Sequence, residues 1–224
     1  MKTFLATAAA ALTFIATASA DWVIESKIES PMMNTTTLTK IKGDKVRSDM
    51  ATGPMGAMSS IIDATTGESI QLIHAQKMAM KTSAAQMKQA MEMAKQAAGA
   101  KTDGASTKPQ PTGQKEKVGG YDCEIWAWSA GDMSARFWVA PGHPQASALK
   151  EMEKKMRGGA LAGMQAGPDS SVLPGPAIKT ETTAMGMKTT MTVLSIKEQD
   201  VDAKEFDVPA GYNAMAMPAL PGAK

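Results

Sequence analysis

The sequence contains little of what most catalytic and metal sites are built from. It has one cysteine, Cys123, and two histidines, His74 and His143. A lone cysteine cannot form an intramolecular disulfide, and structural zinc needs three or four cysteine, histidine or acidic ligands. No nucleophile motif flanks either histidine, and no phosphate-binding glycine loop is present. We therefore expect no enzyme, no metal site on these residues, no cofactor, and chance surface positions for both histidines.

An excess of charge of one sign is also missing. The chain has 24 Lys and Arg residues against 22 Asp and Glu residues, for a formal net charge of +2. Such a balance produces no strong field to attract a polyanion. Beyond the first twenty residues, no apolar run approaches the roughly 20 residues that a membrane-spanning helix needs. We expect no nucleic acid partner and no integral membrane span.

The first twenty residues have the three parts of an export signal. Lys2 supplies the positive start, an apolar run follows from Phe4 to Ala16, and the small residues 18–20 form a cleavage site. Asp21 follows, where a lipoprotein would carry a cysteine for acylation. The sequence therefore predicts a signal peptide at 1–20 and a soluble mature chain in the periplasm or outside the cell.

The mature chain has the pattern of short strands separated by turn residues. In the first strand, Trp22, Ile24 and Ile28 alternate with charged residues, as in a sheet with one face in water. We expect strands near 22–30, 34–42, 45–50, 57–63, 69–75, 77–81, 120–128, 133–140, 177–185 and 187–197.

Two helices and a long loop interrupt these strands. Ser83 to Gln86 fits a capping box at the start of a helix that Gly99 ends. A second helix is expected to start at Pro144 and to use Leu149 and two methionines as its apolar stripe. Residues 99–114 are rich in glycine, proline and polar residues, which favours a disordered loop. Residues 215–224 are expected to form a flexible tail.

The segment from Gly120 to Ala140 predicts a hairpin with two apolar faces. An even-numbered loop would place Cys123 and Trp138 on one face. It would place the following side chains together on the other: Trp126, Trp128, Met133, Phe137 and Val139. One face must meet the core, and the other must be covered by a helix, a ligand or a partner. We expect Cys123 to be a buried structural residue, although a thiol that pairs two chains stays open.

The chain resembles one known superfamily in the order and spacing of four segments: 42–50, 61–63, 119–124 and 206–212. This is the periplasmic lipoprotein carrier superfamily (LolA/LolB-like), and within it the chain is most similar to an uncharacterised exported family, a domain of unknown function. The resemblance implies an α+β fold over 21–214, a strongly curved incomplete antiparallel β-barrel with helices covering its concave face. It also implies that the hollow takes acyl chains and that Arg47 helps to hold the helical lid.

Methionine is the residue in excess, with 20 in the chain. Several occur in pairs with one residue between them: Met78/Met80, Met91/Met93, Met185/Met187 and Met215/Met217. Thioethers are soft ligands suited to Cu(I), but flexible methionine also suits a pocket for variable apolar guests. Because the pairs are dispersed along the sequence, core or pocket lining is the favoured interpretation.

Together these features favour an exported binding protein that holds a lipid, acyl chain or other apolar guest in a hydrophobic cavity. The expected ligand-binding residues are Trp126, Trp128, Met133, Phe137 and Arg47. Two alternatives stay open: a methionine-rich copper-binding or redox-buffering envelope protein, and a structural envelope protein without a ligand. A lipid or apolar small molecule is the expected partner, and an envelope protein is a further candidate.

Overall fold

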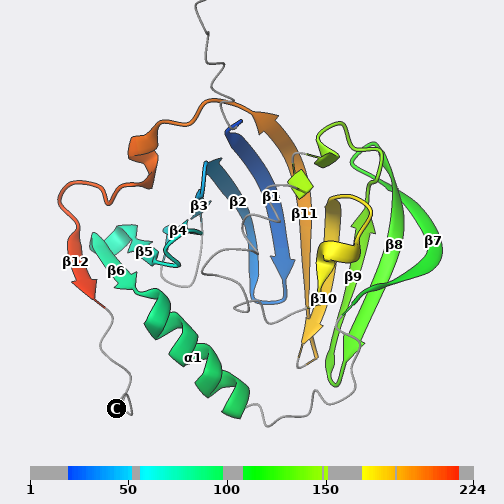
Figure 1. The fold of residues 1–224 in the computed structure, drawn as a ribbon, viewed down its shortest axis with the longest axis horizontal. Coiled ribbons are helices and arrows are strands. Elements are labelled where there is room, and N and C mark those ends of the chain that lie inside the picture. Colours follow the sequence, from blue (N-terminus) through cyan, green and yellow to red (C-terminus); the bar gives the residue numbers. More distant parts are fainter. Residues whose placement is uncertain are drawn as a thin grey trace, which may run out of the picture.

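The computed structural model describes residues 20–51, 56–97, 108–147, 149–150, 168–184 and 186–216. The described strands form one sheet in the order β12-β6-β5-β4-β3-β2-β1-β11-β10-β9-β8-β7 (Figure 1). Every neighbouring pair is antiparallel except β12 and β6, which are parallel. The strands are β1 (Trp22–Ser30), β2 (Met33–Lys42), β3 (Lys45–Met50), β4 (Met58–Asp63), β5 (Ser69–Ile73), β6 (Met78–Thr82), β7 (Gln110–Val118), β8 (Tyr121–Ala130), β9 (Met133–Val139), β10 (Ala177–Ala184), β11 (Met187–Glu198) and β12 (Asn213–Ala216).

The strands predicted from alternation and turn residues are confirmed to within about two residues at their ends. In the hairpin of β8 and β9, Ala130 pairs with Met133, so the loop has two residues. Gly131 begins this loop with a φ of 56°, a conformation that glycine adopts without steric cost. The loop is even-numbered, as the interpretation of the two apolar faces required.

Cross-strand pairing sorts the side chains of the sheet into two faces, since directly paired residues point to the same side. One row of partners crosses six strands and defines what we name the Trp126 face: Trp126, Phe137, Thr180, Met191, Ile28 and Thr35. The adjacent row lies on the other side: Ile125, Trp138, Lys179, Thr192, Lys27 and Thr36. Thr36 alternates along β2 with Lys40, which pairs with Arg47, so we name this side the Arg47 face.

The sheet is strongly curved and open, and a short 3₁₀ helix, η2 (Ser170–Val172), lies inside the curve (Figure 1). Leu173, which follows η2, packs against Phe137 on the Trp126 face. The mostly β, open architecture confirms the coarse fold prediction.

Helices covering the concave face are not confirmed. The helix α1 (Ala84–Ala97) begins with the predicted capping box, because Ser83 Oγ accepts the N–H of Gln86 at 3.3 Å and Gln86 Oε1 accepts the N–H of Ser83 at 2.9 Å. However, the described side chains of α1 are half-buried or exposed. Residues 146–147 and 149–150 are helical and Leu149 is buried, but the rest of the predicted second helix lies outside the described residues.

Two predictions of disorder were wrong in part. Residues 110–114, expected in the loop, belong to β7, and Met215 and Ala216, expected in the tail, belong to β12. Pro111 favoured a loop because proline is excluded from central strands, whereas β7 is an edge strand, where proline is tolerated. Residues 99–107 and 217–224 lie outside the described residues, so disorder there stays a prediction.

The chain after β11 crosses the Arg47 face. Its 3₁₀ helix η3 (Ala203–Phe206) carries Phe206, which is buried in a cluster with Val201, Ile61 and Leu72. This C-terminal segment therefore shields the sheet on the side opposite to η2.

Candidate functional site

The predicted aromatic site forms one cluster on the Trp126 face of β8 and β9. Trp126 pairs directly with Phe137, and Trp128 pairs with Ala135. Phe137 is buried, whereas Trp126 and Trp128 are half-buried and pack against the cluster from its edge. The ring nitrogen Nε1 of Trp126 is buried and has no hydrogen-bond partner among the described residues. The cluster is apolar but retains one unused donor.

Two of the predicted site residues do not belong to this cluster. Met133, at the far end of β9, is 39% exposed. Arg47 lies on the opposite face of the sheet, so it cannot share a site with Trp126 and Phe137. The resemblance matched Arg47 to a lid-holding arginine by its position in the sequence. That position does not indicate on which face of the sheet the side chain lies, because strand register decides the face.

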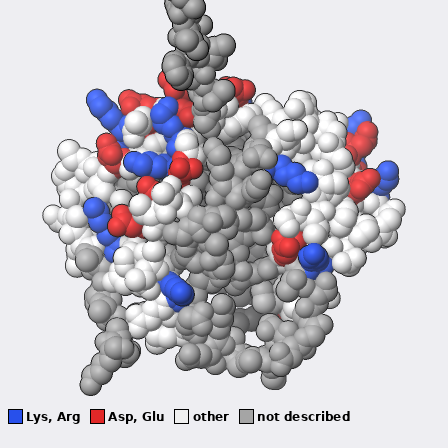
Figure 2. Space-filling model, in the orientation of Figure 1, with Lys and Arg blue, Asp and Glu red and all other residues white. Residues whose placement is uncertain are grey.

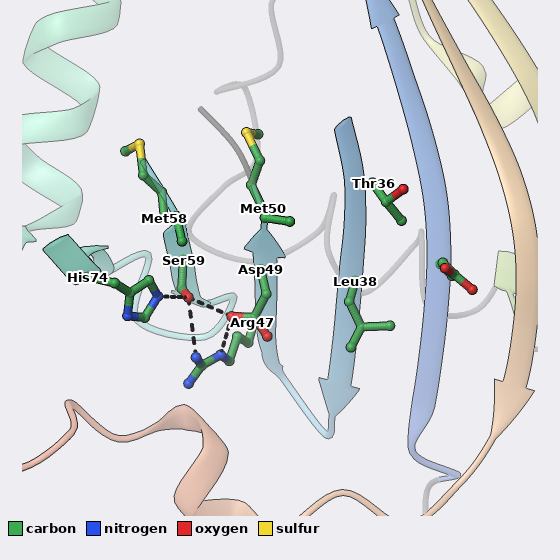
Figure 3. Close-up of a pocket in the computed structure, with 11 residues that line it drawn as sticks. Thr36, Leu38, Arg47, Asp49, Met50, Met58, Ser59 and His74 are labelled. Carbon is green, nitrogen blue, oxygen red and sulfur yellow. Dashed lines mark hydrogen bonds and ion pairs between the residues drawn. The ribbon is translucent and has the colours of Figure 1, made fainter. Parts of the chain in front are cut away.

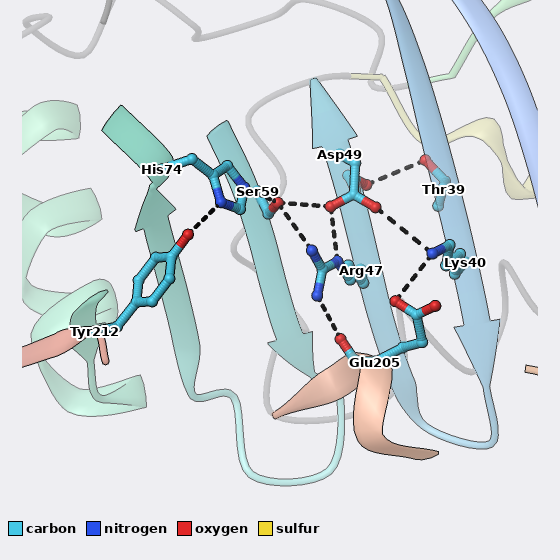
Figure 4. Close-up of polar contacts among 9 residues, drawn as sticks. Thr39, Lys40, Arg47, Asp49, Ser59, His74, Glu205 and Tyr212 are labelled. Atoms are coloured by element: carbon cyan, nitrogen blue, oxygen red, sulfur yellow. Dashed lines mark hydrogen bonds and ion pairs between the residues drawn. The ribbon is translucent and has the colours of Figure 1, made fainter. Parts of the chain in front are cut away.

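Arg47 instead fastens the C-terminal segment to β3 (Figure 4). Its side chain is 12% exposed, and its Nε donates to Asp49 at 2.7 Å. Its two terminal nitrogens donate to the backbone carbonyl oxygen of Glu205 at 2.6 Å and to Ser59 Oγ at 3.2 Å. Lys40 pairs with the Glu205 carboxylate at 3.0 Å. The arginine therefore does hold a covering segment, but that segment is η3.

Ser59, His74 and Tyr212 extend this network in a chain of short contacts (Figure 4). His74 Nε2 lies 2.7 Å from Ser59 Oγ, and His74 Nδ1 lies 2.5 Å from the Tyr212 hydroxyl. Ser59 Oγ donates its only proton to Asp49 at 2.6 Å. Proton counting therefore assigns the hydrogen of a neutral His74 to Nε2, which donates to Ser59, while Nδ1 accepts from Tyr212.

This arrangement does not activate a nucleophile. A catalytic serine must expose its oxygen and donate its proton to the histidine base. Ser59 is 1% exposed, and its proton is directed to a carboxylate. The network is suited to holding the strands β3 and β4 and the 3₁₀ helix η3 together. No sequence pattern predicts this network, because Tyr212 is separated from His74 by 138 positions.

A pocket of about 500 Å³ adjoins the network on the Arg47 face, near the ends of β3 and β4 (Figure 3). Arg47, Asp49, Ser59 and His74 line one part of it. The remainder is mostly apolar and is formed by side chains that include Leu38, Met50 and Met58. Arg47 and Asp49 already bind each other, which leaves the apolar wall and the carboxylate of Glu25 as the available surface of the pocket.

The remaining reactive residue types are buried. Cys123 is 1% exposed, which confirms its predicted burial, and burial raises the pKa of its thiol. His143 was predicted at the surface, and this was wrong: it is 6% exposed, and burial lowers its pKa. The centres of the His143 and Tyr121 rings lie 4.5 Å apart, and the Nδ1 of His143 accepts the N–H of Gln145. The tight packing of a turn residue was not visible in the sequence.

Electrostatics provide no single-sign surface on the side shown in Figure 2, where the described acidic and basic residues are interspersed. Among the described helices, none is long and apolar enough to cross a membrane. The described part of the chain also contains no group of three or more His, Cys, Asp or Glu residues placed to hold a metal ion.

Similar structures extend over most of the chain at low identity. PNGF-II in the C2 space group has 12% identity and a TM-score of 0.43, covering 88% of this chain and 31% of that chain. The Mycobacterium tuberculosis lipoprotein LppX has 6% identity and a TM-score of 0.43, covering 80% and 88%. A DUF1329 family protein from Desulfovibrio piger has 9% identity and a TM-score of 0.27, covering 86% and 91%. This chain thus spans about a third of PNGF-II.

No curated protein matches the sequence. A family model does match, over residues 23–212, which is nearly the whole described sheet. The match confirms the predicted assignment to an uncharacterised family, and the open curved sheet agrees with the superfamily that the sequence resembles. The chain therefore belongs to the family described as domain of unknown function, DUF4412.

Proposed function

We propose that the chain is an exported, non-catalytic binding protein that holds a lipid, an acyl chain or another apolar guest on the Trp126 face. The observation that carries this proposal is the hairpin of β8 and β9, which is apolar on both faces. Its Arg47 face has a buried cluster of its own around Cys123 and Trp138. The aromatic cluster of the Trp126 face is therefore not part of that core, and its two tryptophans are only half-buried.

The driving force is sufficient for an acyl chain. Each buried methylene contributes about 0.8 kcal/mol, so about six of them supply roughly 5 kcal/mol before ordering costs. Tryptophan and phenylalanine also provide a large contact area with few rotatable bonds. The Nε1 of Trp126, which has no hydrogen-bond partner in the described part of the chain, is a donor that an ester or carboxylate oxygen of a lipid would satisfy.

Tryptophan fluorescence of the delipidated mature protein tests the proposal. Titration with fatty acids of several chain lengths should give a saturable blue shift, and Trp126→Ala or Phe137→Ala should abolish it. Trp138→Phe is the matched control, because Trp138 neighbours Phe137 on β9 but points to the Arg47 face. The control should bind like the wild type.

Native mass spectrometry of protein purified from its own envelope provides the second measurement. A retained lipid in the wild type, absent from Phe137→Ala that is still folded, supports the proposal. If no chain length changes the fluorescence and no lipid is retained, the aromatic cluster is only core and the proposal fails. N-terminal sequencing of the same material should begin at Asp21; retention of the full-length chain in the cytoplasm would contradict export.

A further inference from the structure

A methionine pair of one strand and a methionine distant in the sequence lie side by side at one edge of the sheet. Met78 and Met80 belong to β6, and Met215 belongs to β12, the edge strand. Met80 and Met215 are direct partners in the parallel pairing of these strands. The strand ends are held together because the N–H of Asn213 donates to the carbonyl oxygen of Lys77 at 2.8 Å.

All three thioethers lie on the same face of the sheet. Residues two apart in a strand point to the same side, which unites Met78 and Met80, and direct partners share a side, which adds Met215. Neighbouring strands lie about 4.8 Å apart, and residues two apart are separated by about 7 Å. Methionine has three rotatable bonds beyond its backbone, so sulfur atoms at these spacings can converge on one ion.

The three side chains are accessible and bring no charge to the site. Met215 is 55% exposed, and Met78 and Met80 are half-buried. Alternation directs the neighbouring Lys81 to the opposite face. A set of neutral sulfur ligands without a carboxylate or imidazole selects a soft monovalent ion over zinc, calcium or magnesium.

We propose that Met78, Met80 and Met215 form a three-thioether site for Cu(I). The site lies on strands β6 and β12, away from the aromatic cluster of β8 and β9, and it does not depend on the proposed guest. It is a binding site only, and no redox step is part of the proposal.

The structure distinguishes the methionine pair of β6 from other methionine pairs in the sequence. Met187 has the same one-residue spacing to Met185, but its cross-strand partner is Ala184. Met91 and Met93 belong to the helix α1 and not to a strand. Met50 and Met58 are also direct partners on neighbouring strands, but each is a single methionine of its strand. In β6 two methionines share a face, and Met215 of the neighbouring strand adds a third.

Competition with a chromophoric Cu(I) chelator under anaerobic, reducing conditions tests the site. The mature protein should withdraw one equivalent of Cu(I) from the chelator. The double variant Met80→Leu/Met215→Leu should bind Cu(I) at least about tenfold more weakly, because losing even a residue that only supports a metal ligand lowers metal affinity by about that factor. The matched control is Met185→Leu/Met187→Leu, which removes the same sequence motif at a place where the direct cross-strand partner of Met187 is Ala184. Leucine has a volume close to that of methionine, so both variants should stay folded, as thermal unfolding checks.

X-ray absorption at the copper edge should show sulfur ligands only. Cys123→Ser should retain the affinity, because the Cys123 thiol is buried on the Arg47 face. The proposal is overturned if the wild type withdraws no Cu(I), if the control loses as much affinity as the Met80/Met215 variant, or if nitrogen or oxygen ligands dominate the spectrum.

Discussion

Arg47 donates to the backbone carbonyl oxygen of Glu205 at 2.6 Å, a contact that joins β3 to η3 across 158 positions of the chain. The same guanidinium also binds Asp49 and Ser59, so one side chain connects two strands and the C-terminal segment. Hydrogen bonds to charged groups are worth more than neutral ones, and their loss leaves buried partners unpaired.

Arg47→Met should therefore lower the free energy of unfolding by about 2 kcal/mol, because its removal leaves the Glu205 carbonyl oxygen without its side-chain donor and Asp49 without its hydrogen-bonded charged partner. Urea unfolding measures the loss, and amide hydrogen exchange should accelerate in residues 203–212. Lys40→Met is the control: it removes the ion pairs of Lys40 with Glu205 and, at 3.9 Å, with Asp49, and a partly exposed pair contributes less than about 1 kcal/mol. Equal losses in the two variants would contradict the anchoring role.

Asp21 makes stability depend on pH. Burial raises the pKa of its carboxyl, but the hydrogen bonds from Lys42 and from the N–H of Val201 outweigh burial and hold the pKa below its ordinary value. A carboxylate whose folded-state pKa is lowered stabilises the fold above its unfolded pKa, and this stability is lost as the pH falls through the folded pKa. Acid should therefore weaken the wild type as Asp21 becomes protonated.

Asp21→Asn should be less stable than the wild type at pH 7 by about 2 kcal/mol, and the difference should shrink below about pH 4. Urea unfolding between pH 7 and pH 3 measures both effects. Asp200→Asn is a matched control, because Asp200 also pairs with Lys42 but its side chain is 93% exposed. Parallel stability curves for wild type and Asp21→Asn would refute the role of Asp21.

Deletions can separate the predicted loop from β7. Removing 101–107 should change the unfolding free energy by about 1 kcal/mol or less, because the entropy of loop closure varies slowly with length. Removing 102–112 also takes away the start of β7, including Thr112 Oγ1, which donates to the Ile125 carbonyl at 2.7 Å. The longer deletion should destabilise more in thermal unfolding. Equal effects would show that residues 110–112 contribute nothing to the sheet.

Trp138 fastens the edge strand β7 from the Arg47 face. Its Nε1 donates to the Glu116 carboxylate at 2.6 Å, and Lys179 Nζ lies 4.1 Å from the centre of its ring system. Trp138→Phe should lower the unfolding free energy by about 1 to 2 kcal/mol and accelerate amide exchange in β7. Glu116→Gln, which keeps an acceptor, should lose less. Unchanged exchange in β7 would show that pairing with β8 alone holds the strand.

Strand positions and the two faces of the β8–β9 hairpin followed from the sequence, because alternation, turn residues and loop parity act within a few residues of the chain. The same locality explains the capping box at Ser83. Cys123 was correctly assigned to the interior, since it lies between apolar positions of a strand whose other face is also apolar.

Only the tertiary structure decided which distant strands become neighbours. It put Arg47 on the face opposite to Trp126, made the proline-containing β7 an edge, and joined His74 to Tyr212. It also brought Met215 beside Met80. Side-chain alternation is a property of each strand alone, whereas the face that a residue shares with a distant partner depends on strand order and register, which the packing of the whole sheet determines.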